Sequence, residues 1–463
     1  MRHSLADRFV VAENLLLAGV GAERRGRLIR NVLSNNRRRV VLGGSEKNMP
    51  NPTDKSFAIP KRMVWEAWRQ VRANKGAAGV DGQTVDEFEA DLKNNLYRIW
   101  NRMSSGTWFP PPVRAVEIPK SHGDGVRVLG VPTIADRVAM TTVAMYLEGL
   151  VEPRFHRDSY GYRPKKSALD AVGVCRQRCW SYDWVIDLDV QEFFDTVPWD
   201  LIIKAVESVT DTGWVLLYVK RWLAAPLQHP DGNLVRRSRG TPQGSAISPC
   251  LANLFMHHAF DAWMDREHPD CPFERYCDDV IVHCASKRQA VQVLDAITMR
   301  FSELGLSLHP KKTRVVYCKD DTRRGQHEHI SFTFLGYAFR PREAINGRTG
   351  RHFASFAPAV SPEALKAAGA RLRELRIHRR TDLSLTRLAR WLNPIVAGWM
   401  QYYGRFRRSQ LYPLLRRVSS YLRRWAAKKY RRLRTHKQFK RWWNGLLKRE
   451  PGLFAHWRWI PTL

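Results

Sequence analysis

Acidic residues are scarce in this 463-residue chain. It has 44 Asp and Glu against 77 Lys and Arg, which gives a net charge of +33 and a pI of about 10.4. A surplus of this size repels itself unless a polyanion neutralises it, so nucleic acid is the expected partner. The hydrophobic content of 44% still provides enough apolar surface for packed cores.

Long apolar runs and paired cysteines are also missing. No run reaches the length of a membrane-spanning helix and no convincing secretory signal stands near the N-terminus, so we expect a cytoplasmic protein without a membrane partner. The seven cysteines include no Cys-x-x-Cys pair, which argues for a reducing compartment and against zinc. Cys175 and Cys179 stand four residues apart on a predicted helix, where buried thiols are the favoured interpretation.

Two adjacent aspartates, Asp278 and Asp279, stand in the apolar stretch 273–284. The β-branched residues 280–282 predict a strand, 275–277 predict a shorter one, and the aspartate pair falls where a hairpin would turn. Neighbouring carboxylates repel each other, and a divalent cation is the usual compensation, with Mg2+ or Mn2+ preferred by hard oxygen ligands. Taken alone, the stretch also fits an ordinary Asx turn.

A second pair of carboxylates lies in the alternating stretch 184–190. Trp184, Ile186 and Leu188 share one face of the predicted strand. Asp187 and Asp189 share the other face, where they need water, a partner or a metal.

Two further segments offer groups that suit phosphate chemistry. A predicted hairpin over 113–131 brings Lys120 and Arg127 together, and two such cations can clamp a triphosphate; two solvated surface charges are the alternative. The Gly/Pro-rich loop 239–249 carries Gln243 and leads into a predicted helix. Ordering such a loop costs free energy, so a ligand-binding role is expected for it.

The C-terminal part is basic and helical. Ser361 and Pro362 begin a predicted helix, and the helices that follow are expected to break at Pro394 and near Pro413. Residues 401–450 contain 17 Lys or Arg against one acid, with ten aromatics between them. This composition suits stacked bases and phosphates, and the alternative is a helical bundle with an aromatic core and solvated charges.

These groups together suit two-metal phosphoryl transfer. Three carboxylates can bridge two ions, one of which would lower the pKa of a primer 3′-hydroxyl while the other holds the triphosphate. Cations would neutralise the charge that develops on the phosphates. The side chains are Asp189, Asp278, Asp279, Lys120, Arg127, Gln243 and Lys312.

From about Phe57 to near its C-terminus, the chain resembles the group II intron reverse transcriptases, the maturases encoded within self-splicing introns. The motifs that carry the resemblance are Gly79-Val80-Asp81-Gly82, Ile118-Pro119-Lys120, Leu129-Gly130-Val131-Pro132, Ser159-Tyr160-Gly161-Tyr162-Arg163-Pro164, the Asp189 segment, Pro242-Gln243-Gly244, Tyr276-Cys277-Asp278-Asp279, Phe334-Leu335-Gly336, and Asn393-Pro394 with Gly398-Trp399.

The resemblance implies an α+β right-hand polymerase with helical fingers, an antiparallel-sheet palm and an all-α thumb or maturase domain. The corresponding ranges are 49–180, 181–340 and 341–463, after a weakly ordered basic extension over 1–48. It implies a site for two Mg2+ ions, with Mn2+ also possible, and gives Asp187 a secondary or structural role. The implied metal ligands are Asp189, Asp278 and Asp279.

The resemblance also implies contacts with nucleotide and RNA. Phe194 matches the aromatic that excludes a 2′-hydroxyl, and a bulky ring there would clash with that group on steric grounds as well. The other implied nucleotide contacts are Lys120, Arg127, Gln243 and Lys312, and basic residues chosen as RNA contacts are Arg423, Arg424, Arg431 and Arg432.

The sequence departs from the family pattern at Cys277, where Ala is usual, and at Ser245-Ala246, where Gly-Val is usual. No endonuclease-like tail follows the thumb, so we expect no DNA cleavage. The function implied is an RNA-directed DNA polymerase, associated with RNA or the nucleoid. It would bind its group II intron RNA, assist splicing, and copy an RNA template from a DNA primer with deoxynucleoside triphosphates. A splicing-only maturase and a reverse transcriptase recruited to host defence or repair are the alternatives.

Overall fold

The computed structural model describes residues 55–119 and 126–461. The chain divides into two compact units. The first comprises the described residues up to Ser167 with Leu188–Val280 and Val291–Thr313, and the second comprises Ala168–Asp187, Ile281–Ala290 and the described residues from Arg314. The expected extension over 1–48 and the side chain of Lys120 lie outside the described residues. Within the described residues, no helix is both long and apolar enough to cross a bilayer.

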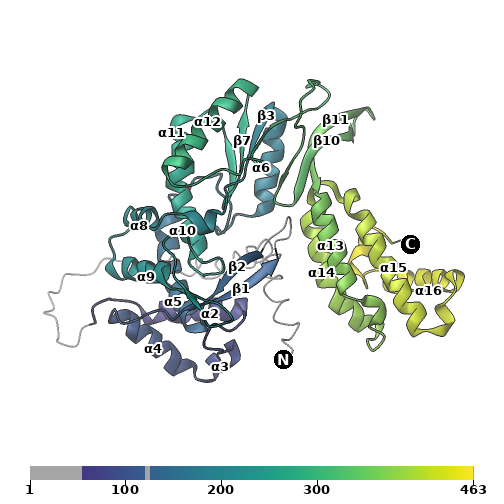
Figure 1. Ribbon diagram of the computed structural model, residues 1–463. Coiled ribbons are helices and arrows are strands. Elements are labelled where there is room, and N and C mark those ends of the chain that lie inside the picture. Colours follow the sequence, from purple (N-terminus) through teal and green to yellow (C-terminus); the bar gives the residue numbers. More distant parts are fainter. Residues whose placement is uncertain (1–54, 120–125, 462–463) are drawn as a thin grey trace, which may run out of the picture. The chain divides into compact units, whose positions relative to one another are not determined.

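The first unit begins with a group of helices, of which α5 (Ile134–Val151) is the most deeply buried (Figure 1). The others are α2 (Lys61–Asn74), α3 (Val85–Ala90) and α4 (Leu92–Ser104). α5 buries residues around most of its circumference, which is typical of a helix at the centre of a core. The position of Thr84 after the glycine-rich stretch 75–82 predicts it as the N-cap of the next helix, α3. This is confirmed, because its hydroxyl accepts from the Glu87 N–H and the Glu87 carboxylate accepts from the Thr84 N–H.

A four-stranded sheet completes this part of the first unit. The order is β2 (Val126–Val131), β1 (Val113–Pro119), β4 (Leu227–Gln228) and β5 (Leu234–Val235). β1 and β2 are antiparallel, with Ile118 opposite Arg127, so the predicted hairpin is confirmed.

The rest of the first unit is mainly helical. Its helices are α7 (Phe193–Thr196), α8 (Trp199–Glu207), α9 (Gly213–Ala224), α10 (Ser248–Met256), the π-helical turn η1 (His257–Asp261) and α11 (Ala262–Glu267), while α12 (Lys287–Glu303) begins in the second unit. A second four-stranded sheet, most of whose residues belong to the second unit, has the order β6 (Phe273–Tyr276), β7 (Asp279–Cys284), β3 (Trp184–Leu188) and β8 (Arg314–Tyr317). β3 and β8 are antiparallel, with Asp187 opposite Arg314.

The second unit contains α6 (Ala168–Ser181) and a three-stranded sheet. The order is β11 (His352–Val360), β10 (Tyr337–Ile345) and β9 (Phe332–Phe334), and Figure 1 shows β10 and β11 as a long ribbon. The apolar residues of the stretch 332–339 predict a single strand, and this prediction is wrong. Leu335 and Gly336 have φ of 49° and 76°, so the chain turns there and β10 pairs antiparallel with β9.

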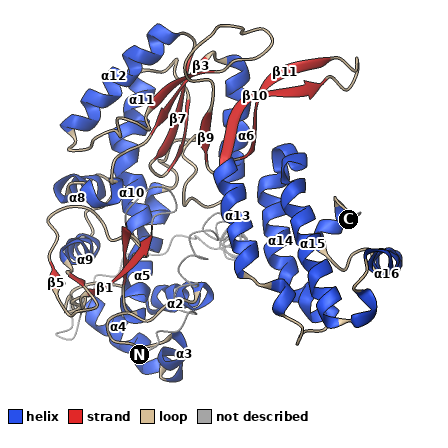
Figure 2. Ribbon diagram, turned by 45° about the vertical axis from the view of Figure 1, so that its right-hand side comes forward, coloured by secondary structure: helices blue, strands red, loops and turns tan. Residues whose placement is uncertain are grey.

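Helices follow the ribbon and pack side by side in the second unit (Figure 2). The main ones are α13 (Pro362–Glu374), α14 (Leu385–Arg407), α15 (Tyr412–Lys429) and α16 (His436–Arg449), joined by the short turns η2 (Ile377–Arg379), η3 (Arg408–Leu411) and η4 (Arg431–Leu433). The predicted start is confirmed, because the Ala364 N–H donates to Ser361 Oγ. The expected break at Pro394 is wrong, since α14 continues through it.

The aromatic residues of these helices are divided between core and surface. Phe439, Trp425 and Trp443 are almost completely buried, with exposed fractions of 0%, 0% and 1%. The alternative of an aromatic core therefore holds for these three side chains, and base stacking is left to partly exposed rings such as Tyr421.

Candidate active site

The two adjacent aspartates lie at a tight hairpin between β6 and β7. The turn is formed by Cys277 and Asp278, while Asp279 is already the first residue of β7. The predicted turn is thus displaced by one residue toward the N-terminus. Cys277 carries the unusual backbone, with φ of 64°, which costs free energy for a residue other than glycine.

Gly161 lies directly against this turn. A Cβ atom on Gly161 would be 2.6 Å from the Cys277 nitrogen, so no larger residue fits without moving the hairpin. The neighbouring backbone also pairs with β6, because the Tyr160 N–H donates to the Arg275 carbonyl and the Arg275 N–H donates to the Asp158 carbonyl.

The side chain of Arg275 holds the hairpin from inside. It is completely buried, and its guanidinium makes five hydrogen bonds. The acceptors are Asp261 Oδ1 and Oδ2 at 2.6 Å each, Ser159 Oγ at 2.8 Å, the Cys277 carbonyl at 2.9 Å and Asn253 Oδ1 at 3.0 Å. A guanidinium has five N–H donors, so every donor has an acceptor.

Asp261 compensates the buried charge of Arg275. Burial raises the pKa of Asp261, but the adjacent guanidinium outweighs this effect and holds that pKa below its usual range. Asp261 ends the π-helical turn that follows α10, and π-turns re-aim side chains at functional sites. Here the turn directs Asp261 and Asn253, eight positions earlier, to the same guanidinium.

Sequence reasoning did not single out Arg275, Asp261 or Asn253. The available signal was a charged residue inside an otherwise apolar strand. Its partners could not be found this way, because Ser159 precedes Arg275 by 116 positions and Asp261 lies on a different element.

Asp189 follows the end of β3 and is held by the segment after α12. Its N–H donates to Thr313 Oγ1 at 3.3 Å, and its carbonyl accepts from the His309 N–H at 2.8 Å. Lys312 Nζ lies 2.9 Å from Asp189 Oδ2. The structure thus brings together Lys312 and Asp189, which are far apart in the sequence.

Asp189 also lies within electrostatic range of the hairpin. The pKa of Asp278 is raised by burial first and by the negative charge of Asp189, while Arg127 opposes the shift. Asp279, by contrast, is exposed. A carboxylate whose pKa is raised by the charge of a neighbouring carboxylate favours a nearby cation, and hard carboxylate oxygen atoms suit Mg2+ or Mn2+. The residues present therefore fit a divalent metal site.

Phe194 lies on α7 beside the loop that carries Gln243. The Thr241 N–H donates to the Phe194 carbonyl at 2.6 Å, and the Gly240 N–H donates to the Val197 carbonyl at 2.8 Å. Gly240 has φ of 75°, and a Cβ there would lie 2.6 Å from the Phe194 carbonyl oxygen. Glycine is thus required for the loop to approach the Phe194 turn this closely.

Gln243 is fixed at both its backbone and its side chain. Its carbonyl accepts from the Gly130 N–H at 2.7 Å, and its Nε2 donates to Asp195 Oδ2 at 3.3 Å. Burial and Glu192 raise the pKa of Asp195, whereas Arg237 and Arg127 lower it. Arg127 therefore acts on Asp195 as well as on Asp278. Asp195 was missed at the sequence level, although it follows Phe194 directly.

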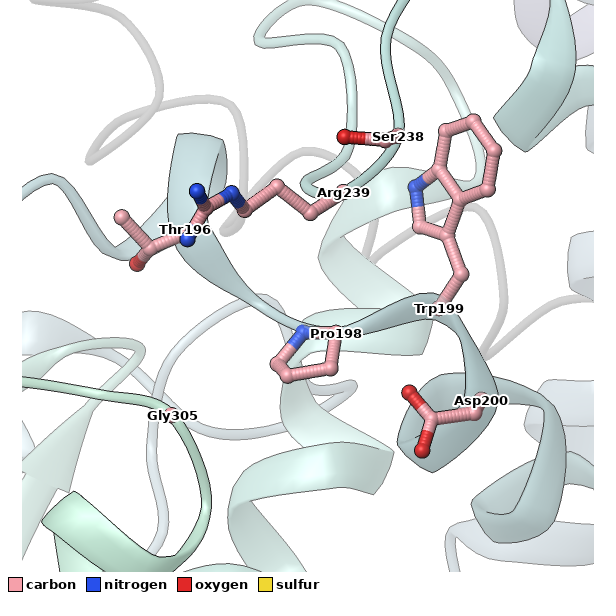
Figure 3. Close-up of a pocket in the computed structure, with 7 residues that line it drawn as sticks. All are labelled: Thr196, Pro198, Trp199, Asp200, Ser238, Arg239 and Gly305. Carbon is pink, nitrogen blue, oxygen red and sulfur yellow. The ribbon is translucent and has the colours of Figure 1, made fainter.

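A surface depression of about 490 Å3 lies between the start of this loop and residues 196–200 (Figure 3). Its lining consists of Thr196, Pro198, Trp199, Asp200, Ser238, Arg239 and Gly305. None of the three candidate metal-binding aspartates lines it, so it is distinct from the site built by β3 and the hairpin.

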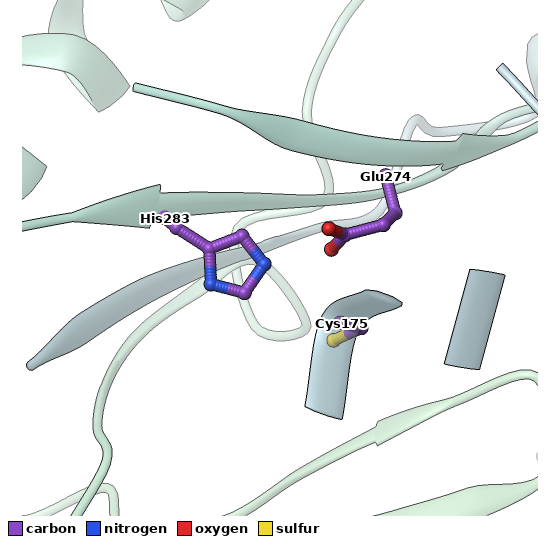
Figure 4. Close-up of side chains that lie close together, drawn as sticks. All are labelled: Cys175, Glu274 and His283. Carbon is purple, nitrogen blue, oxygen red and sulfur yellow. The ribbon is translucent and has the colours of Figure 1, made fainter. Parts of the chain in front are cut away.

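Buried thiols gather in the second unit. Figure 4 shows Cys175 of α6 and His283 of β7, with ligand atoms within 4.8 Å, and also labels Glu274, which belongs to the first unit. Burial raises the pKa of the Cys179 thiol to about 12, and this thiol interacts with Cys175, Cys318 and His283. All seven cysteines lie among the described residues, where they are buried and form no disulfide, and this confirms Cys175 and Cys179 as core thiols.

The candidate RNA contacts lie in the second unit. Arg423 and Arg424 are exposed on α15, and Arg431 and Arg432 are exposed on η4.

Comparison with known proteins decides the family. Residues 118–339 match the family described as reverse transcriptase (RNA-dependent DNA polymerase). Residues 365–443 match the maturase-specific domain of group II introns, and the two matches together cover more than half of the chain. The chain belongs to the group II intron reverse transcriptase/maturase family. The α+β fold expected from the sequence is that of this family.

Several curated proteins are similar to this group II intron reverse transcriptase/maturase. Protein YkfC of Escherichia coli is 34% identical over 47% of the chain and 60% of its own length. The group II intron-encoded protein LtrA of Lactococcus lactis is 29% identical over 50% of the chain and 40% of its own length. The putative COX1/OXI3 intron 2 protein of Saccharomyces cerevisiae is 32% identical over 42% of the chain. The chain spans less than two thirds of the length of these relatives.

The Arg275–Asp261 pair generates a stability prediction. Asp261→Asn keeps the shape of the side chain but leaves a buried cation without its counter-charge, so the free energy of unfolding should fall by about 3–5 kcal/mol. Chemical denaturation measures the change. The matched control is Glu66→Gln, which removes an exposed i,i+4 pair with Arg62 and should cost no more than about 0.5 kcal/mol. Equal effects of the two substitutions would show that Asp261 does not balance the guanidinium.

Proposed function

We propose that this chain is an RNA-directed DNA polymerase that binds its group II intron RNA, assists splicing and copies RNA into DNA. The observation that carries the proposal is that the negative charge of Asp189 raises the pKa of the Asp278 carboxyl in a chain of this family. A splicing-only maturase would have no need to hold two carboxylates close enough to repel each other.

Asp189, Asp278 and Asp279 would hold two divalent ions, for which Mg2+ is the first choice and Mn2+ the second. When bound, the ions supply Lewis-acid activation of the primer 3′-hydroxyl and neutralise charge on the leaving pyrophosphate. Lys312 already contacts the Asp189 carboxylate, and it is proposed to shift its ammonium to the triphosphate when the cations occupy the site. Arg127 would provide a second positive charge, and the same role is proposed for Lys120.

The incoming nucleotide would be selected by α7, which carries Phe194, and by the loop that carries Gln243. These two segments approach each other closely at Gly240. Phe194 would place its ring against the sugar, so that a 2′-hydroxyl clashes with it and deoxynucleotides are preferred. Gln243 would face the incoming nucleotide, with Asp195 holding its carboxamide in one orientation. Backbone hydrogen bonds hold both segments in place, which supports these proposed roles.

Intron RNA would bind the basic helices of the second unit. Arg423, Arg424, Arg431 and Arg432 are exposed there, and the match to the maturase-specific domain covers all four residues. The division into an N-terminal extension over 1–48, fingers over 49–180, palm over 181–340 and thumb over 341–463 remains a proposal.

Replacement of a candidate metal ligand tests the polymerase activity directly. Asp278→Asn should reduce deoxynucleotide incorporation on an RNA template by about 10³-fold or more, because it removes charge from the metal site, while RNA binding persists. Primer extension and an RNA-binding assay measure the two properties. Asp211→Asn, an exposed acid elsewhere in the first unit, should leave both unchanged. Full extension by Asp278→Asn would remove this residue from the metal site, and no extension by the unaltered protein would leave only the splicing role.

Phe194 provides a prediction on sugar selectivity. Phe194→Ala should reduce discrimination against ribonucleotides by roughly 10–100-fold, the range expected when a steric clash of about 1–3 kcal/mol is relieved. Phe194→Tyr keeps the bulk of the ring and should retain the discrimination. The ratio of kcat/KM for matched deoxynucleotides and ribonucleotides measures it. An unchanged ratio in Phe194→Ala would refute the role.

The basic turn η4 provides a prediction on RNA binding. The double variant Arg431→Gln/Arg432→Gln should weaken binding and lower the slope of log affinity against log salt by about one for each arginine that no longer neutralises a phosphate. Titrations of a labelled intron RNA at several salt concentrations measure the slope. Arg266→Gln, at an exposed arginine paired with Glu267 in the first unit, should leave the slope unchanged. An unaltered slope in the double variant would place the RNA elsewhere.

A further inference from the structure

A group of cations surrounds one histidine where α13 ends and η2 begins. His378 lies in η2, between Arg376 and Arg379, and α15 contributes the remaining groups. We define the His378 cluster as His378, Tyr421, Arg376, Arg379, Arg424 and Lys428, all of which belong to the second unit.

Ring contacts organise the centre of the His378 cluster. The imidazole of His378 and the ring of Tyr421 are stacked, with centroids 6.0 Å apart and planes inclined by 26°. The guanidinium of Arg424 lies 5.5 Å from the centroid of the Tyr421 ring. Both rings are partly exposed, so a flat polar ring and a flat aromatic ring are presented beside a cation.

The four cations of the His378 cluster are exposed, and none forms an ion pair with an acid of the described chain. The acid Glu374, two residues before Arg376, is paired with Arg371 at 3.4 Å. Charge of one sign therefore accumulates without a protein counter-charge, and a bound anion would relieve the repulsion.

The environment of His378 changes the pKa of its imidazole. Its pKa is lowered by burial first, and then by Arg379, Lys428, Arg424 and Arg376. Its Nδ1 atom is buried and makes no hydrogen bond to any described residue. The surroundings therefore favour the neutral imidazole of His378. The elements η2 and α15 supply cations and the phenol ring of Tyr421 but no acidic side chain.

We propose that the His378 cluster binds a phosphate group of an RNA strand, and that binding is coupled to the uptake of a proton by His378. This inference rests on the proposed RNA-binding function and adds a site and a pH dependence to it. A phosphate among the four cations cancels part of their field, so the imidazolium is stabilised in the complex and can donate a hydrogen bond to a phosphate oxygen.

The sign of the coupling follows from these charges. The free protein disfavours the imidazolium and the complex favours it, so the complex holds the proton at a higher pH than the free protein does. Affinity for RNA should therefore rise as pH falls through the range in which the imidazole titrates.

The rings favour RNA over an acidic peptide as the occupant. A carboxylate would satisfy the cations equally well, but it would leave the exposed parts of the His378 and Tyr421 rings unused. A nucleotide offers a phosphate for Arg376, Arg379, Arg424 and Lys428 together with a base that can stack on an exposed ring.

Binding of a fluorescein-labelled RNA hairpin at about pH 8 and about pH 6 tests the proposal. The unaltered full chain should gain roughly fivefold in affinity at the lower pH relative to His378→Gln, which has a neutral side chain of similar reach. His436→Gln, at an exposed histidine on α16, is the matched control and should behave like the unaltered chain. The NMR titration of the His378 imidazole should also show a higher pKa with saturating RNA.

Two results would overturn the inference. One is an identical pH dependence in His378→Gln and the unaltered chain, and the other is a His378 pKa that does not change with RNA. Displacement of the RNA by polyglutamate of equal charge would assign the cluster to an acidic protein instead. Failure of the unaltered chain to bind RNA at any pH would contradict the proposed function itself, whereas binding without the His378 dependence would contradict only this inference.

Discussion

The buried ion pair between Arg275 and Asp261 is the constraint on which the candidate site depends. It uses every N–H donor of the guanidinium and joins β6, α10, the π-helical turn and the segment before Gly161. One of those donors reaches the Cys277 carbonyl, at the residue whose positive φ makes the turn. The buried guanidinium of Arg275 therefore stabilises a hairpin that has an unfavourable backbone conformation and two adjacent acids.

In the candidate site itself, a few positive and negative side chains offset one another. Asp189 and Asp278 raise the free energy of one another in their ionised forms, and Lys312 and Arg127 offset part of that cost. Arg127 also acts on Asp195, which orients Gln243. The proposed metal site and the proposed nucleotide pocket thus share one cation, so a change at Arg127 is expected to affect both.

Local features of the fold were predictable because their causes lie within a few residues. The capping box at Thr84, the β1–β2 hairpin and the proline start of α13 follow from short patterns. The turn at Leu335-Gly336 was missed, because the apolar pattern of β9 and β10 continues across it. Pro394 is accommodated inside α14, against the expectation from its ring. The Arg275 network was missed because its partners are brought together only by the tertiary fold.

We propose that Asp189 and the hairpin aspartates coordinate the same metal ions. The most direct measurement is the anomalous diffraction of Mn2+ in crystals of the protein with an RNA template, a DNA primer ending in a dideoxynucleotide and the next deoxynucleoside triphosphate. Mn2+ peaks coordinated by both Asp189 and Asp278 are expected. Peaks bound by only one of these residues, or lying at another site, would contradict this proposal.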